Sequence, residues 1–379
     1  MKIMLRSHCV WLVPVVITSI GFGLDTGAAK AQTTDTVSAN YDVKMNIDQK
    51  SAINLNYKLL VNSQGTNSVK EYNAITGEFV KDFVPSGSGG LGGPTGLTVG
   101  PNGNLFVISF TNNSVKQYNG ITGEFIADFV PSGSGGLNQP YNLTFGPNGD
   151  LFVGSSGNNS VKRYDGITGD FIADFVPSGS GGLSVTDDVT FGPNGNFFTT
   201  SFGNSSVKEY NGITGEFVKD FVPSGGGGLN SPIGFAFRNG SLFVASGGTD
   251  SVKQYNGITG EFVSDFVPSG SGGLNLPLGL TYSPNGNLFV SGFGDDKGIK
   301  EYNEITGEFV SDFVLPGSGG LKSPGYLIFA PIVAKVPEPI SVIGLLAVAA
   351  FASKMLKGKR QESLALGGIS DKLKASRFC

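Results

Sequence analysis

A five-residue motif, Ile-Thr-Gly-(Glu/Asp)-Phe, recurs six times along the chain and constrains its fold more than any other feature. Consecutive copies are separated by 46, 46, 46, 45 and 47 residues. A fixed period of this length is typical of proteins in which each copy forms one supersecondary unit that packs against its neighbours. The copies begin at Ile75, Ile121, Ile167, Ile213, Ile258 and Ile305.

Each period contains four short apolar segments separated by turn residues. In the second copy these segments are 96–100, 104–110, 114–118 and 124–130, and they are rich in the β-branched and aromatic residues that strands favour. Asn-Gly pairs lie between the first and second segments and between the third and fourth, where they favour tight hairpins. We therefore expect each period to form a four-stranded antiparallel sheet.

Six such sheets predict an all-β fold, a six-bladed β-propeller over residues 51–334. The first copy begins with a strand of the second type, 53–61, and a spare strand of the first type, 323–330, follows the last copy. We expect this C-terminal strand to pair with the first blade and close the ring, which removes exposed strand edges.

The turns absorb the differences in repeat length. The period of 45 residues has a shortened turn at 238–240, and the period of 47 residues has a lengthened turn at 294–298. Asp295 and Asp296 in that turn are predicted to be solvated. Connectors of the type Pro-Ser-Gly-Ser-Gly-Gly-Leu, such as 131–137, lack the Lys and the following helix of a phosphate loop, so we predict flexible linkers.

Lys and Asp recur at fixed positions on the last two strands of each blade. Opposite charges across a hairpin stabilise it modestly and keep outer strands soluble, so we expect the two sets to form pairs near the blade periphery. Because they occur six times, they are poor candidates for a catalytic site. The pairs are Lys70 with Asp82, Lys116 with Asp128, Lys162 with Asp174, Lys208 with Asp220, Lys253 with Asp265, and Lys300 with Asp312.

Two Phe residues spaced i, i+4 also recur on the last strand of each blade, for example Phe79 with Phe83 and Phe125 with Phe129. In a regular strand this spacing places both rings on one face. We expect both rings of each pair to fill the gap between blades.

The segments GLTVGPNGNLFVISF and SVKQYNGITGEF (96–110 and 114–125) resemble the NHL-type six-bladed propeller repeats of exported bacterial proteins. The resemblance covers roughly residues 51–334 and implies that the first strand of each blade lines a central channel. Only one blade then places carboxylates in the channel, namely Asp187 and Asp188. Together with Asn142 they are the candidate residues for a channel site. The aligned channel residues are Gly96, Asn142, Asp188, Gly234, Gly279 and Tyr326, preceded by Thr95, Tyr141, Asp187, Ile233, Leu278 and Gly325.

The first 31 residues have the basic start, apolar run and Ala-Lys-Ala end of a secretory signal peptide, and residues 32–50 form a separate N-terminal segment. Cleavage would remove His8, Cys9 and Trp11 and leave Cys379 as the one cysteine. The exported chain would then have neither an internal disulfide nor a Ser/His or Cys/His nucleophile. We predict no cofactor and no metal, because a lone acidic pair would need Asn142 and backbone carbonyls to hold calcium.

Residues 335–360 combine the motif Val336-Pro337-Glu338-Pro339, an apolar run from Ile340 to Leu356 and a basic cluster. The apolar run predicts one transmembrane helix, with the tail 361–379 in the cytoplasm and the propeller outside. The arrangement resembles a PEP-CTERM sorting signal, which implies recognition by an exosortase-type membrane protease and a destination in the cell envelope or an extracellular polysaccharide matrix. A plain C-terminal anchor that is never cleaved is the alternative.

Two classes of function follow. The first is a non-enzymatic binding or adhesion module that contacts surface proteins or a polysaccharide. The second is a lyase or hydrolase that acts at the channel mouth through Asp187 and Asp188. Nucleic acid is excluded as a partner, because residues 32–334 hold 15 Lys and Arg against 26 Asp and Glu.

Overall fold

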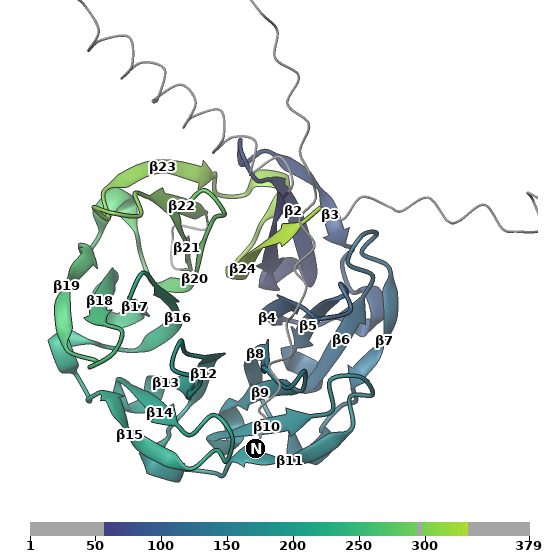
Figure 1. The fold of residues 1–379 in the computed structure, drawn as a ribbon. Helices are drawn as coiled ribbons and strands as arrows, with labels where there is room; N and C mark the ends of the chain where they lie inside the picture. Colours follow the sequence, from purple (N-terminus) through teal and green to yellow (C-terminus); the bar gives the residue numbers. More distant parts are fainter. Residues whose placement is uncertain (1–56, 294–297, 333–379) are drawn as a thin grey trace, which may run out of the picture. The chain divides into compact units, whose positions relative to one another are not determined.

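The computed structural model describes residues 57–293 and 298–332, which form a six-bladed β-propeller (Figure 1). Six antiparallel sheets of four strands surround a central channel, with the first strand innermost and the fourth outermost. This confirms the predicted architecture. The predicted signal peptide, N-terminal segment, sorting motif, apolar run and tail all lie outside the described residues. Within those residues, no helix is long and apolar enough to cross a membrane.

The strands follow the predicted segments to within a few residues. Blade 1 consists of β24 (Pro324–Pro331), β1 (Tyr57–Ser63), β2 (Ser68–Asn73) and β3 (Phe79–Val84). Blade 2 consists of β4 (Pro94–Val99), β5 (Leu105–Ser109), β6 (Ser114–Tyr118) and β7 (Phe125–Val130). Blade 3 consists of β8 (Pro140–Phe145), β9 (Leu151–Ser155), β10 (Ser160–Tyr164) and β11 (Phe171–Val176). Blade 4 consists of β12 (Thr186–Phe191), β13 (Phe197–Ser201), β14 (Ser206–Tyr210) and β15 (Phe217–Val222). Blade 5 consists of β16 (Pro232–Arg238), β17 (Ser241–Ser246), β18 (Ser251–Asn256) and β19 (Phe262–Val267). Blade 6 consists of β20 (Pro277–Tyr282), β21 (Leu288–Gly292), β22 (Ile299–Tyr302) and β23 (Phe309–Val314).

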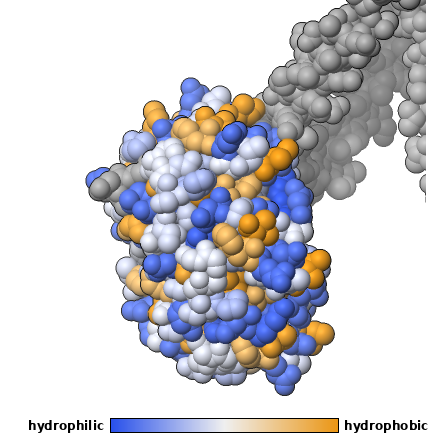
Figure 2. Space-filling view, turned by 90° about the vertical axis from the view of Figure 1, so that its left-hand side faces the viewer, coloured by the Kyte–Doolittle hydropathy of each residue, from blue (hydrophilic) through white to orange (hydrophobic). Residues whose placement is uncertain are grey.

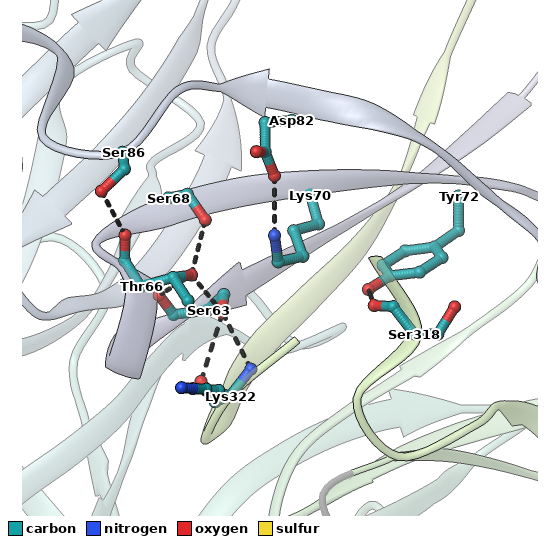
Figure 3. A network of polar contacts seen from close by, with 9 residues as sticks. All are labelled: Ser63, Thr66, Ser68, Lys70, Tyr72, Asp82, Ser86, Ser318 and Lys322. Atoms are coloured by element: carbon teal, nitrogen blue, oxygen red, sulfur yellow. Dashed lines mark hydrogen bonds and ion pairs between the residues drawn. The ribbon is translucent and has the colours of Figure 1, made fainter. Parts of the chain in front are cut away.

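The C-terminal strand closes the ring as predicted. β24 pairs antiparallel with β1, and the register places Tyr57 opposite Pro331 and Val61 opposite Leu327. Next to this ladder the Ser63 hydroxyl accepts a hydrogen bond from the Lys322 backbone N–H at 3.1 Å (Figure 3). Blade 1 is therefore built from both ends of the propeller, and its inner edge is not left open.

The Lys and Asp residues of the outer hairpins pair in all six blades, as predicted. Lys70 lies directly opposite Asp82 in the register, and its ammonium is 2.7 Å from the carboxylate (Figure 3). The equivalent distances in the other blades are 2.5 to 2.6 Å. The lysines are buried, whereas the aspartates are about half exposed. Only the aspartate therefore adds a polar group to the surface.

The prediction that both Phe rings lie on one face is wrong, because the outermost strand is bulged. In blade 1 the register passes from Glu71–Lys81 to Tyr72–Phe79, so Val80 is an extra residue. One extra residue turns the side chains beyond it to the opposite face. Phe83 is buried, whereas Phe79 is 37% exposed and packs edge-on against the Tyr72 ring.

Each outermost strand carries the same two bulges, at the positions of Val80 and Phe83 in blade 1. Bulges disrupt the row of unpaired backbone groups that an edge strand offers to other chains. The rim of the propeller is thus a poor template for adding a further strand.

The glycine-rich connectors have a defined conformation rather than the predicted flexible one. Each forms a short 3-10 turn such as η2 (Ser88–Gly90), with Gly87, Gly89 and Gly90 at positive φ. The Tyr118 hydroxyl of the next blade donates a hydrogen bond to the Ser88 carbonyl at 2.8 Å, and the same bond joins Tyr72 to Ser318 in Figure 3. A Cβ on Gly89 would lie 2.1 Å from the Phe125 ring, so the connector packs tightly on that blade.

The hydrophobic core consists of six clusters, one between each pair of adjacent blades. Val69 and Phe83 of blade 1 pack with Leu97 and Leu105 of blade 2, and all four are at most 3% exposed. Burying side chains of this size stabilises the fold by about 1.5 to 3 kcal/mol each. The other five clusters repeat this arrangement around the ring.

The glycine of the Ile-Thr-Gly motif completes each contact between blades. Gly123 has a φ of +78°, and a Cβ there would lie 1.8 Å from the Phe83 carbonyl oxygen of the preceding blade. No side chain fits at that distance. The equivalent glycines approach the neighbouring blade equally closely, and they are Gly77, Gly169, Gly215, Gly260 and Gly307.

Candidate functional site

The third residue of each inner strand decides how the channel is filled. In three blades it is glycine, because the neighbouring inner strand lies too close for a side chain. A Cβ on Gly96 would lie 2.8 Å from the Tyr141 carbonyl oxygen, and one on Gly234 would lie 2.4 Å from the Leu278 carbonyl oxygen. The other three blades place polar side chains there, namely Asn142, Asp188 and Tyr326.

Asp188 is hydrogen-bonded to the blades on both sides of it. Its Oδ1 accepts hydrogen bonds from the Asn142 side-chain amide and from the Val189 backbone N–H, and its Oδ2 accepts one from the Phe235 N–H at 2.8 Å. Its own N–H donates to the Thr200 hydroxyl at 2.9 Å. The structure thus brings the predicted candidates Asn142 and Asp188 into direct contact, and Asp188 is only 6% exposed.

Asp187 is hydrogen-bonded to β24, the strand that closes the ring. The Tyr326 hydroxyl, carried by β24, donates a hydrogen bond to Asp187 Oδ1 at 2.8 Å. Both residues are buried. Sequence reasoning aligned Tyr326 with the channel positions but did not single it out as a site residue. The available signal was that a large hydroxyl-bearing residue replaces glycine at that position.

Burial raises the pKa of both carboxyl groups from 3.8 to about 7. The hydrogen bond from Tyr326 opposes this shift in Asp187, and the Phe235 N–H opposes it in Asp188. Burial also raises the pKa of Tyr326, and the charge of Asp187 adds to that effect. Near neutral pH each of the two carboxyl groups is therefore partly protonated, while the Tyr326 hydroxyl keeps its proton and remains a hydrogen-bond donor.

A cavity of about 330 Å³ extends along the inner strands from this cluster. Asn142 and Asp188 form part of its wall, together with half-buried threonines and apolar side chains from all six blades. None of the described residues that line it is a Lys, Arg or His. The site can donate and accept hydrogen bonds and can take up a proton near neutral pH, but its walls supply no positive charge.

The structure brings no metal site together among the described residues, where no three His, Cys, Asp or Glu side chains are grouped to hold an ion. Asp188 has its oxygens occupied by protein donors, so it is poorly placed to act as a calcium ligand. Asp295 and Asp296 lie outside the described residues, as do the sorting-motif residues Val336 to Pro339.

Comparison with known proteins defines the fold and nothing narrower. No family model matches the sequence, and no curated protein matches it. Among solved structures, a chain of a nidogen/laminin complex aligns over 73% of this chain and all of its own length, with 14% identity and a TM-score of 0.58. A protein of unknown function from Bacteroides caccae aligns over 72% of this chain and 98% of its own, with 17% identity and a TM-score of 0.57.

Virginiamycin B lyase from Staphylococcus aureus aligns over 73% of this chain and 88% of its own, with 17% identity and a TM-score of 0.50. At these identities each similarity supports a six-bladed β-propeller only. The class of protein is therefore settled by the fold, while its activity has to be argued from its own residues.

Proposed function

We propose that this protein is an exported, non-enzymatic β-propeller that serves as a binding or adhesion module of the cell surface or extracellular matrix. Its C-terminal segment anchors it in the envelope, and Val336 to Pro339 form a PEP-CTERM sorting motif for an exosortase-type membrane protease. The export and sorting steps rest on the sequence patterns alone. The binding role rests on the surface of the propeller.

The observation that carries this proposal is that every blade exposes the same side chains on its outermost strand. The first Phe of each strand is 37 to 43% exposed, the bulged residue after it is 45 to 55% exposed, and the paired Asp lies two residues further on. Figure 2 views one side of the rim, where hydrophobic and hydrophilic side chains alternate. The bulged residues are Val80, Ile126, Ile172, Val218, Val263 and Val310.

Six copies of one surface favour a ligand that is itself repetitive, such as a polysaccharide or an array of surface proteins. Several weak contacts then add up to strong attachment, because each binding event after the first is intramolecular. A chain of a nidogen/laminin complex has a similar fold, so such a fold occurs in a protein that was solved bound to a partner.

A glycan array probed with the purified full-length protein in detergent tests this proposal. We expect binding to one class of repetitive glycan. Replacing the bulged residue by Ser in one blade should weaken attachment slightly, and replacing it in all six should weaken it by about 100-fold or more. Ile167→Ser, in the exposed turn that precedes the outermost strand β11 and not on the strand itself, is the matched control. Absence of glycan binding would contradict a polysaccharide ligand, and equal loss from the single and sixfold variants would contradict attachment through the repeated side chains of the rim.

The second candidate function is a lyase or hydrolase at the channel, and two observations favour it. The cavity reaches Asp188, and both buried carboxyl groups have a pKa of about 7, which suits a general base or acid at neutral pH. Virginiamycin B lyase, which has a similar fold, is an enzyme. Against it, Asp188 is already bonded to three donors, and a developing negative charge would meet no cationic side chain among the described lining residues.

Mass spectrometry of polysaccharide and ester substrates incubated with the protein separates the two functions. Turnover by the parent that Asp187→Asn and Asp188→Asn both abolish, with both variants folded, would establish the enzyme. Binding to the array without any change of ligand mass would support the binding module.

A further inference from the structure

One face of the propeller carries the turns between first and second strands and between third and fourth strands, and we call it the turn face. The two sets of turns contact each other: the Gly257 N–H donates to the Gly240 carbonyl at 2.8 Å, and a Cβ on Gly120 would lie 1.8 Å from the Gly103 carbonyl oxygen. The connectors and the turns between second and third strands lie at the other ends of the strands.

The turn face presents isoleucines that pack against little of the protein. Ile167 is 91% exposed, Ile213 is 85% exposed, and Ile258 and Ile305 are each 81% exposed. Single exposed apolar side chains are common on soluble proteins. Here four β-branched side chains that are almost fully exposed recur at equivalent turn positions of consecutive blades, and we call this set the apolar arc.

Hollows between the blades adjoin this arc. A cavity of about 220 Å³ is bounded by Ile213 and Pro147, and one of about 470 Å³ is bounded by Ile258 and Pro193. The larger cavity lies beside the shortened turn at 238–240. The exposed isoleucines and these two hollows give this face an uneven contact surface rather than a single shaped pocket. A fluid lipid surface can adapt to such a shape better than a rigid partner can.

Both ends of the described chain lie on the turn face. β24 ends at Pro331, which pairs with Tyr57 at the start of β1. Residues 333–339 then separate the propeller from the apolar run that begins at Ile340. Seven residues span at most about 25 Å. If Ile340 to Leu356 enters a bilayer, the end of β24 on the turn face is held within that distance of the bilayer surface.

We propose that the turn face rests on the bilayer, with Ile167, Ile213, Ile258 and Ile305 entering the interface of a neutral phospholipid surface. Each of these turns also exposes a carboxylate three residues after the isoleucine, which disfavours anionic lipid. The assignment rests on the proposed anchoring. It leaves the rim, which carries the proposed ligand-binding side chains, exposed beside the membrane.

Fluorescence quenching in phosphatidylcholine vesicles tests the contact on the full chain, with Cys9 and Cys379 replaced by Ser. A single environment-sensitive label is placed at Ile213→Cys, at Phe202→Cys on the opposite face, or at Leu345→Cys in the apolar run. Lipids with a nitroxide near the headgroup should lower the signal at 213 by about twofold or more, and leave that at 202 unchanged.

The labels separate failure of this inference from failure of the anchoring. Quenching at 345 without quenching at 213 overturns the membrane contact and leaves the anchor intact. Absence of quenching at 345 overturns the anchor, and with it the basis of the contact. Equal quenching at 213 and 202 also overturns the contact, since it would mean that the propeller lies on the bilayer in no preferred orientation.

A substitution series provides the second measurement, with the label moved to Pro193→Cys on the same face. Changing all four isoleucines to Ser should remove most of the lipid quenching, whereas changing them to Val should retain it. Because these side chains are exposed, neither change should alter the thermal unfolding temperature by more than a few degrees. Full quenching in the Ser variant would overturn the assignment.

Discussion

The outer hairpins and the channel of this propeller come from the same repeat, yet they behave differently. The six Lys–Asp pairs of the hairpins agree in distance to within 0.2 Å. At the channel the same repeat supplies glycine, asparagine, aspartate or tyrosine at one position. The copies thus agree where every blade makes the same contact, and they differ where each inner strand meets its own neighbours at the channel.

The largest expected effect on stability comes from the contact that the Ile-Thr-Gly glycine makes between adjacent blades. Gly123→Ala should destabilise the protein by about 4 kcal/mol or more, because its Cβ would overlap the Phe83 carbonyl oxygen of the preceding blade. Gly133 also has a positive φ, but a Cβ on it would have no atom within 4 Å, so Gly133→Ala should cost only about 1 kcal/mol. Urea unfolding of both variants measures the difference. Equal losses would mean that backbone strain, not the contact between blades, sets the cost.

The next prediction compares an aspartate of the channel with an aspartate of an outer hairpin. Asp188→Ala leaves the Phe235 and Val189 N–H groups and the Asn142 amide without their acceptor, so it should cost about 3 kcal/mol. Asp128→Ala removes a half-exposed partner from Lys116 and should cost about 1 kcal/mol. The same unfolding assay ranks them. The reverse order would show that the channel cluster contributes little to holding the blades.

The buried acidic pair predicts that the stability of the protein depends on pH. The folded pKa of Asp187 and Asp188 is raised from 3.8 to about 7, so between these values the folded state binds more protons than the unfolded state. Their contribution to stability is therefore full below about pH 4 and is lost as the pH rises through about 7. Unfolding curves at pH 5 and pH 8 should show it. The double variant Asp187→Asn, Asp188→Asn should lose this slope, and an unchanged slope would assign it to other groups.

The smallest expected effect lies on the outer surface, where the copies differ without consequence. Lys81 and Lys219 pair with Glu71 and Glu209 at 3.7 Å in two blades, and other blades have Ala or Ser at the same position. Lys81→Ala should cost about 0.5 kcal/mol or less, because the lysine is half exposed. A loss above about 1 kcal/mol would show that this pair stabilises blade 1 specifically.

Sequence reasoning reached the blades, the closure of the ring and the Lys–Asp pairs because each depends on a short-range pattern that is repeated six times. It failed at the Phe79 and Phe83 pair, since a bulge at Val80 changes the face of a side chain without changing the sequence period. It also treated the connectors as flexible, although glycines such as Gly89 are required there by close packing on a ring of the next blade.

The candidate site was only partly accessible to the same reasoning. The alignment of copies drew attention to Asn142, Asp187 and Asp188 because they depart from glycine or apolar residues. Their hydrogen bonds depend on which inner strands are neighbours across the channel, and that follows from ring geometry rather than from sequence separation. The bond between Asp187 and Tyr326 joins residues 139 positions apart.

The pairing of β1 with β24 also sets the order in which the protein can mature. β1 is the first of the described strands to be synthesised and β24 is the last, so five blades can assemble while the first waits for its partner. During that interval the edge of β1 is free to capture a β24 from another molecule, which would link chains into swapped oligomers. Slow synthesis of many chains close together should therefore favour polymers, and rapid completion of each chain should favour single rings.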